Sequence, residues 1–196
     1  MENLATRLDE YPNGYQDEMP TELINGVIVA MAPPVTNHSR VLSRIHTVFG
    51  KYLENKHCEV FSDLHLHISK NDRVIPDLMV VCKQNIIKRD GIHGAPDLIV
   101  EILSPSTKKR DKGYKKNLYE QCGVLEYWIV DTTSRSIEVY LLTDGKLEFD
   151  NIYEIYPDYV LEYMTEEEKT ALPYEFKTSL FDDLVIKLED VFRGVQ

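Results

Sequence analysis

Three side chains near the middle of the sequence have the types and spacing needed for chemistry on a phosphodiester. Asp77 follows a proline at the start of the apolar run "PDLMVV", and Glu101 lies inside a second apolar run, "APDLIVEILS". A charged glutamate buried in such a run costs several kcal/mol unless a cation or a hydrogen-bond donor accompanies it. If the two runs are neighbouring strands, both acids can hold a hard divalent cation through oxygen ligands. Lys115, on the helix expected next, can reach the same point.

These residues would support metal-assisted hydrolysis. The metal would polarise a phosphoryl oxygen, and the lysine would orient a water molecule or help to deprotonate it. A structural interpretation stays open for Asp77, because an acid at a strand end is often solvated or bonded to backbone. Glu101 is harder to explain by structure alone, since it lies in the middle of an apolar strand.

A cluster of basic residues follows Glu101, although the whole chain has a formal net charge of −11. The stretch from Ser104 to Asn117 carries a net +5, which leaves −16 for the rest, and its basic residues are Lys108, Lys109, Arg110, Lys112, Lys115 and Lys116. The first four fall at or before the expected helix start, where cations oppose the helix dipole. We therefore expect Lys108, Lys109, Arg110, Lys112 and Lys116 to bind phosphates without reading sequence. The alternative is an ordinary solvated helix face.

Length and composition indicate one folded domain of 196 residues, with 43% hydrophobic and 28% charged residues. No apolar run is long enough to span a membrane, and the opening residues lack the apolar core of a signal peptide. We therefore expect a cytoplasmic protein that does not engage membranes. Cys58, Cys82 and Cys122 are scattered and odd in number, which predicts small core residues and not a disulfide or a thiolate zinc site.

The order of elements predicts a mixed α/β domain with one central sheet. We expect a strand at 27–31, an amphipathic helix at 36–55, and strands at 59–69, 73–83 and 95–104. A second helix should run from 108 or 111 to 122 and end at Gly123. Strands at 125–131 and 136–149 follow, the latter turning at "TDGK". Thr165 and Glu168 fit a capping box in an acidic surface insertion at 157–170.

Some residues allow both a structural and a functional interpretation. His38 has helical spacing with Val41 and Ile45, so it faces inward, and a core histidine is favoured over a residue that lines a site. His65 and His67 share one face of a strand, but no third ligand is evident, so a zinc site is not favoured. Tyr127 and Trp128 lie in an apolar strand and are expected in the core.

The series "PDLMVV", "GAPDLIVEILSPST" and "RDKGYKKNLYEQCGVLEYWIVD" resembles the Uma2 family (formerly DUF820), which belongs to the PD-(D/E)XK nuclease group. "TELINGVIVAMAPP" and "TSLFDDLVIKLEDVF" resemble its first and last segments, so the resemblance covers about residues 20 to 193 of a single domain. The resemblance implies a restriction-endonuclease-like core, a central mixed sheet flanked by helices.

The resemblance also implies roles for particular residues. Asp77 would be the first metal-binding acid and Glu101 the second, with the Ile102 carbonyl as a further ligand. Leu103 stands where many such nucleases have their lysine, so that role moves to Lys115, or less strongly to Lys116. Further matching residues are Glu22 as an added ligand or base, Asp111 as a helix cap or a group that orients Lys115, and Asp97 in a structural role.

The function expected from the sequence is hydrolysis of nucleic acid, most simply DNA, by an endonuclease that uses Mg²⁺ or Mn²⁺. A catalytically silent module that binds nucleic acid or metal is the alternative, and the acidic net charge favours it. A glycosidase based on Asp97 and Glu101 is disfavoured, because two acids on one strand face lie side by side. A homodimer is a further hypothesis, since two active sites would cut both strands of a duplex.

Overall fold

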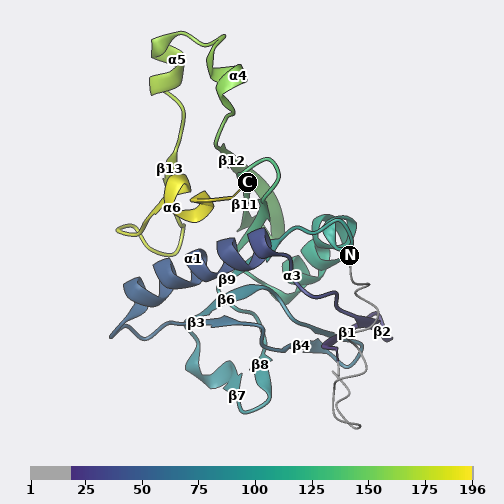
Figure 1. Ribbon diagram of the computed structural model, residues 1–196. Helices are drawn as coiled ribbons and strands as arrows, with labels where there is room; N and C mark the ends of the chain where they lie inside the picture. The colour runs from purple at the N-terminus through teal and green to yellow at the C-terminus, as the bar shows by residue number, and fades with distance from the viewer. Residues whose placement is uncertain (1–18, 196) are drawn as a thin grey trace, which may run out of the picture.

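A six-stranded mixed sheet forms the centre of the computed structural model, which describes residues 19–195 (Figure 1). Its strands, in spatial order, are β12 (Lys146–Glu154), β11 (Ser136–Thr143), β10 (Glu126–Asp131), β9 (Leu98–Ile102), β6 (Leu78–Val81) and β3 (Glu59–Ser62). β9 and β10 are parallel, and the other neighbours are antiparallel. Every residue of β6 and β9 is buried, as expected of central strands covered on both faces.

A second six-stranded sheet lies beside the first and is missing from the sequence prediction, which gives one central sheet. Its order is β2 (Val27–Ala30), β1 (Thr21–Ile24), β5 (Asp72–Val74), β4 (Leu66–Ser69), β8 (Gly91–His93) and β7 (Ile87–Lys88). A short 3₁₀ turn, η2 (Gln84–Ile86), precedes β7. The two sheets arise because two of the predicted strands are each divided.

The divisions have local physical causes. At Asp63 the backbone adopts φ 53°, so residues 59–69 do not form one strand but form β3 in one sheet and β4 in the other. Between β5 and β6, Pro76 has no N–H to donate to a ladder, and the strand stops at Val74 and resumes at Leu78. Asp77 therefore lies in the break between the two sheets.

The two faces of the central sheet are covered differently. α1 (Thr36–Leu53) and α6 (Leu188–Phe192) pack on one face, where α1 buries Val41, Ile45, Phe49 and Leu53. The second sheet and α3 (Lys116–Cys122) cover the other face. Figure 1 shows α1 lying along the central strands. Tyr127 and Trp128 are fully buried, which confirms their predicted place in the core.

The predicted second helix is continuous but changes its geometry. It begins as α2 (Lys108–Arg110), passes through the π-helical turn η3 (Asp111–Lys115) and ends as α3. Gly123 closes it with φ 87°, a left-handed cap that favours glycine. The helix and its end are therefore as predicted, and the wide turn in its middle is not evident from the sequence.

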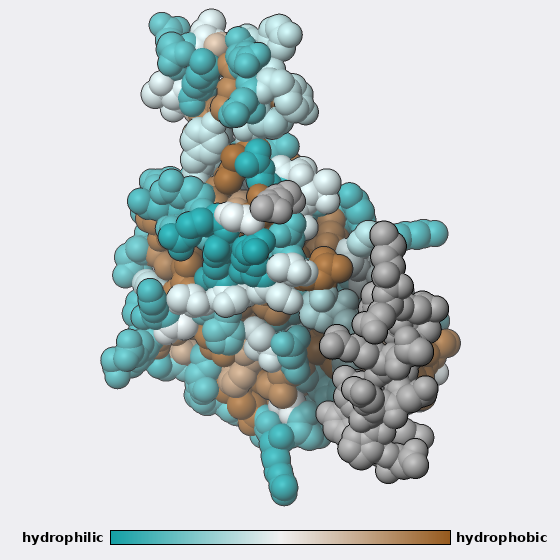
Figure 2. Space-filling view, viewed as in Figure 1, coloured by the Kyte–Doolittle hydropathy of each residue, from teal (hydrophilic) through white to brown (hydrophobic). Residues whose placement is uncertain are grey.

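An arm projects from the body between β12 and β13 (Glu175–Lys177) (Figure 2). It contains α4 (Asp158–Leu161) and α5 (Glu166–Thr170), and Thr165 and Glu168 form the predicted capping box. The returning chain pairs β13 with β14 (Val185–Lys187) before α6. The predicted "TDGK" hairpin is also present, with left-handed φ values at Asp144 and Gly145.

The prediction for the cysteines is wrong in one respect, because Cys58 and Cys82 form a disulfide. They flank the antiparallel pair β3 and β6, in which Glu59 lies opposite Val81, so the ladder brings them together. Cys122 is a free thiol. Within residues 19–195, no helix has the length and apolar character needed to cross a membrane. The opening residues, on which the expectation of no signal peptide rests, lie outside the described part.

Candidate active site

The antiparallel register of β6 and β9 brings the two predicted metal-binding acids together. Leu78 pairs with Val100 and Met79 with Ile99, so continuing the register by one residue places Asp77 opposite Glu101. Glu101 is 3% exposed, and Asp77 lies just outside the ladder with its side chain 13% exposed. The two carboxylates therefore meet where the central sheet gives way to the second sheet.

Lys115 joins three carboxylates in the interior. Its Nζ lies 2.7 Å from Glu22 Oε1, 3.0 Å from Glu101 Oε1 and 3.8 Å from Asp111 Oδ1. The lysine is 2% exposed, and it comes from the π-helical turn η3, a kind of helical irregularity that is frequent at functional sites. Glu22 comes from β1 of the second sheet and also accepts a hydrogen bond from the Ile75 N–H at 3.0 Å. The cluster therefore connects β1 of the second sheet, β9 of the central sheet and the helical turn η3.

Two more side chains fix the orientation of the acids. The Tyr119 hydroxyl donates to Glu101 Oε1 at 2.6 Å, from α3 one turn after Lys115. His38, in the first turn of α1, lies with its Nε2 3.1 Å from Asp77 Oδ1. Asp77 Oδ2 accepts a hydrogen bond from the Ile102 N–H at 2.6 Å. Both metal-binding candidates are thus held in place by neighbours from other elements.

Burial and charge shift the pKa values of the cluster strongly. Burial raises the pKa of Glu101 to about 8, against the opposing effect of Lys115, and the charges of Asp111 and Asp77 raise it further. Burial alone would lower the pKa of Lys115, but Glu101, Glu22 and Asp111 outweigh it, so this pKa is raised. Burial also raises the pKa of Asp111. Lys115 therefore stays protonated at neutral pH and cannot serve as a base there.

The cluster has more carboxylates than cations to match them. Glu22, Glu101 and Asp111 face one buried lysine, with Arg110 at 3.5 Å from Glu22 Oε2. Asp77, opposite Glu101, has His38 beside it. Buried Glu22 Oε2 and Asp111 Oδ1 have no hydrogen-bond partner in the described structure. Oxygen ligands with excess negative charge are what Mg²⁺ and Mn²⁺ prefer. The residues therefore fit a hard divalent cation.

Comparison with known proteins shows the family and the fold of this chain. The family model of Uma2, described as "Putative restriction endonuclease", matches residues 7–163. The chain belongs to the Uma2 family. A solved structure of a "putative nuclease belonging to DUF820" from Anabaena variabilis shares the fold, with a TM-score of 0.63 at 20% identity over 94% of this chain and 96% of that one. The mixed α/β fold class is thereby confirmed.

Two curated relatives come from Synechocystis, and both are named as uncharacterized proteins. One, slr1290, is 36% identical over 126 residues, which cover 63% of this chain and 66% of the relative. The other, sll1609, is 28% identical over 125 residues, which cover 61% of this chain and 71% of the relative. Their names state no activity, so the activity is argued from the site.

The basic run of this Uma2 chain divides into two sets. Lys108, Lys112 and Lys116 form a stripe with a spacing of four residues that faces the central sheet. Lys108 pairs with Asp131 at 3.0 Å, Lys112 pairs with Glu138 at 2.5 Å, and Lys116 donates to the Leu147 carbonyl at 2.6 Å. Of the basic run, Lys109 and Arg110 are the residues that help to line a groove of about 630 Å³ between this helix and the β1–β2 hairpin.

Three other predicted residues have clear structural positions. Asp97 Oδ2 accepts a hydrogen bond from the Cys82 N–H at 2.7 Å, which is the structural role expected of it. Asp111 does not cap the helix, because the helix begins earlier, at Lys108, and the buried Asp111 carboxylate faces Lys115. Ile102 contacts the site through its N–H, which bonds Asp77.

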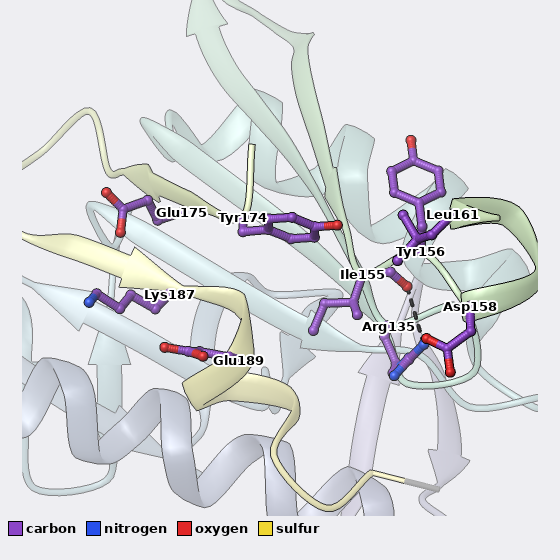
Figure 3. Close-up of a pocket in the computed structure, with 9 residues that line it drawn as sticks. All are labelled: Arg135, Ile155, Tyr156, Asp158, Leu161, Tyr174, Glu175, Lys187 and Glu189. Carbon is purple, nitrogen blue, oxygen red and sulfur yellow. Dashed lines mark hydrogen bonds between the residues drawn. The ribbon is translucent and has the colours of Figure 1, made fainter. Parts of the chain in front are cut away.

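A separate pocket of about 460 Å³ lies at the base of the arm and contains none of these residues (Figure 3). Arg135 donates to the Ile155 carbonyl at its wall, and Tyr174 lies across from them. Its mixed lining has no acid cluster comparable with that around Lys115. The carboxylate cluster is therefore the candidate active site.

Two residues of the site were missed or undervalued from sequence. Tyr119 gives no signal of its own, although its place four residues after Lys115 puts both on one helix face. For His38 the sequence favoured a core histidine over a site residue, and its contact with Asp77 supports the second interpretation.

Proposed function

We propose that this protein is a metal-dependent endonuclease that hydrolyses phosphodiester bonds of DNA, with Mg²⁺ or Mn²⁺ held by Asp77 and Glu101. The observation that carries the proposal is the buried cluster in which one lysine meets Glu22, Glu101 and Asp111 while Asp77 lies opposite Glu101. Such a concentration of buried negative charge is costly unless it binds a cation.

A divalent cation bound there would polarise a phosphoryl oxygen and lower the pKa of a coordinated water. Lys115, protonated and fixed by Glu22 and Glu101, would orient the attacking water and stabilise negative charge as it develops. Tyr119 holds the carboxylate of Glu101, and His38 positions Asp77. Each residue thus has a role that depends on a contact seen in the structure.

The substrate would approach along the groove beside the β1–β2 hairpin. Lys109 and Arg110 line that groove, and Arg110 also contacts Glu22 of the cluster, so the groove leads toward the acids. Phosphate contacts of this kind carry no sequence information. We therefore propose low sequence specificity. We also propose a cytoplasmic location, as expected from the sequence, and a homodimer whose two sites could cut both strands of a duplex.

A silent binding module is the competing function, and the net charge of −11 is the observation that favours it. The two functions differ in what Lys115 should do. In a module that only binds nucleic acid, the lysine would face solvent to meet phosphates, whereas here it lies 3.0 Å from Glu101. That contact supports the proposal of an endonuclease over that of a binding module.

The test is cleavage of supercoiled plasmid and of single-stranded DNA in Mg²⁺ and in Mn²⁺. Glu101→Ala removes a proposed ligand, and Glu148→Ala removes an exposed glutamate of β12 and serves as the matched control. We expect metal-dependent cutting by the wild type and the control and none by Glu101→Ala. Equal cutting by Glu101→Ala would reject the site, and no cutting by any protein would favour the binding module.

A further inference from the structure

A second group of metal-ligating side chains lies on the sheet that contains β1. His67 of β4, His93 of β8 and Asp90 from the turn before β8 place one ligand atom each within 4.8 Å of one another. His93 Nε2 lies 3.1 Å from Asp90 Oδ1, and His67 Nε2 lies 3.8 Å from Asp90 Oδ2. The two imidazole rings stack with centroids 4.2 Å apart. Both histidines thus direct Nε2 at one carboxylate.

The fold builds this arrangement through backbone pairing. β4 and β8 are parallel, with His67 directly opposite His93, so the histidines are cross-strand neighbours on one face. The tight turn between β7 and β8 places the Asp90 carboxylate beside His93, which lies three residues further along the chain. Asp90 also offers its backbone carbonyl, 3.2 Å from His67 Nε2.

Gly91 makes the close approach possible. The Ile92 N–H donates to the His65 carbonyl at 2.8 Å, and a Cβ at Gly91 would lie 2.3 Å from that carbonyl oxygen. The φ of 139° at Gly91 is likewise one that side chains rarely allow. The absence of a side chain at Gly91 therefore lets the β7–β8 turn pack closely against the chain at His65. This close packing holds Asp90 beside the two histidines.

We propose that His67, Asp90 and His93 form a binding site for a divalent transition metal, with Zn²⁺ as the preferred ion. Two imidazoles and one carboxylate are a common zinc ligand set, with bond lengths of about 2.0–2.2 Å. Small side-chain rotations would bring the three ligand atoms to that distance from one ion, since the backbone already places them together. The partly exposed histidines leave the fourth position to water.

The nitrogen ligands distinguish this site from the carboxylate cluster. Mg²⁺ prefers oxygen ligands, whereas imidazole suits Zn²⁺, Cu²⁺ and Ni²⁺. No residue is shared with the set around Lys115, so the two sites would bind different ions. His57 near the cysteines is a weaker candidate, because the sulfurs of Cys58 and Cys82 are bonded to each other.

The bound ion would fasten β7 and β8 to β4 at the edge of the sheet. β7 is the edge strand and has only two residues, so few backbone hydrogen bonds hold it. A ligand that binds only the folded state raises the melting temperature by mass action. Zinc should therefore raise the melting temperature of the wild-type chain and of variants outside this site.

The test is calorimetric titration of the full, metal-free chain with ZnCl₂ in excess Mg²⁺, which on the proposed function would occupy the carboxylate cluster. We compare the wild type with His67→Ala, His93→Ala and His93→Gln, the last of which keeps a polar group near Asp90. Asp77→Asn and His57→Ala are controls that leave the three ligands intact. Circular dichroism of each protein shows whether it is folded.

We expect about one Zn²⁺ per chain in the wild type and in both controls. The histidine variants should bind it at least about 100-fold more weakly, beyond the usual effect of losing an outer partner. Co²⁺ should give the intense visible absorption of a tetrahedral site in the wild type and in both controls, and not in the histidine variants. Unchanged zinc binding in folded His93→Gln and His67→Ala, or no zinc binding by the wild type, would overturn the proposal.

Discussion

Replacing Lys115 with methionine tests the central claim that the buried carboxylates are held by one cation. Methionine keeps much of the length and packing of lysine but removes the charge that contacts Glu22 at 2.7 Å and Glu101 at 3.0 Å. Removing one partner of a buried ion pair costs about 3–5 kcal/mol, because the other charge is left uncompensated. We expect the free energy of unfolding to fall by about 4 kcal/mol, which is a large part of the roughly 5–15 kcal/mol that stabilises a domain.

The loss should depend on pH with a definite sign. The pKa of Glu101 is raised to about 8 in the folded chain by burial, against an ordinary value near 4.5. A carboxyl with a raised folded pKa favours folding at low pH, and that contribution is lost as pH rises from the ordinary value through the folded one. Without Lys115 this pKa rises further, so the variant should lose most stability at alkaline pH and least near pH 5.

Urea unfolding followed by circular dichroism measures the effect at both ends of this range. Lys146→Met, on an exposed residue of β12, is the matched control. The double variant Lys115→Met/Glu101→Gln should recover part of the loss, because it removes one of the unpaired charges. A Lys115→Met variant within about 1 kcal/mol of the control at alkaline pH would refute the reasoning.

Three further predictions concern other parts of the molecule. Mn²⁺ affinity should rise about tenfold per pH unit below pH 8, because the ion displaces a proton from Glu101. Titration calorimetry from pH 6 to 8 measures this dependence, and an affinity that does not change with pH contradicts it. Lys109→Glu should weaken DNA binding and lower the slope of log affinity against log salt concentration by about 1. Lys112→Glu should do neither, because Lys112 pairs with Glu138, and fluorescence anisotropy distinguishes the two variants. Cys58→Ser should cost about 3 kcal/mol in urea unfolding, as the disulfide closes a loop over a separation of 24 residues, and Cys122→Ser should cost less.

Elements with strong periodicity could be predicted from the sequence. The helix at 36–53 follows from apolar residues at helical spacing, and the buried strands β6 and β9 follow from continuous apolar runs. The second sheet could not be predicted, because it depends on a left-handed backbone at Asp63 and on strands of two to four residues. The alternation of Leu64, Leu66 and Ile68 continues across that region regardless of where the strand breaks.

The candidate site was predictable where acids interrupt apolar runs. Asp77 and Glu101 stand out for that reason, and Lys115 lies on the helix expected next. Glu22 is suggested by the family resemblance alone, and the structure brings the four residues to one region. The division of the basic run was not predictable, since it depends on which carboxylates of the neighbouring strands face each lysine. The disulfide and the histidine cluster also depend on cross-strand register, which sequence spacing does not reveal.

The π-helical turn at Asp111–Lys115 makes the site sensitive to chain length as well as to residue identity. Each residue in an α-helix advances the side-chain direction by about 100°. Deleting Gly113, where an added side chain would meet open space, would let the wide turn close into an ordinary one. Lys115 and Tyr119 would then rotate together relative to Arg110, and the lysine could not face Glu22 and Glu101 while Arg110 keeps its place. An indel of one residue here would therefore separate the groove from the acids while leaving every functional side chain in the sequence.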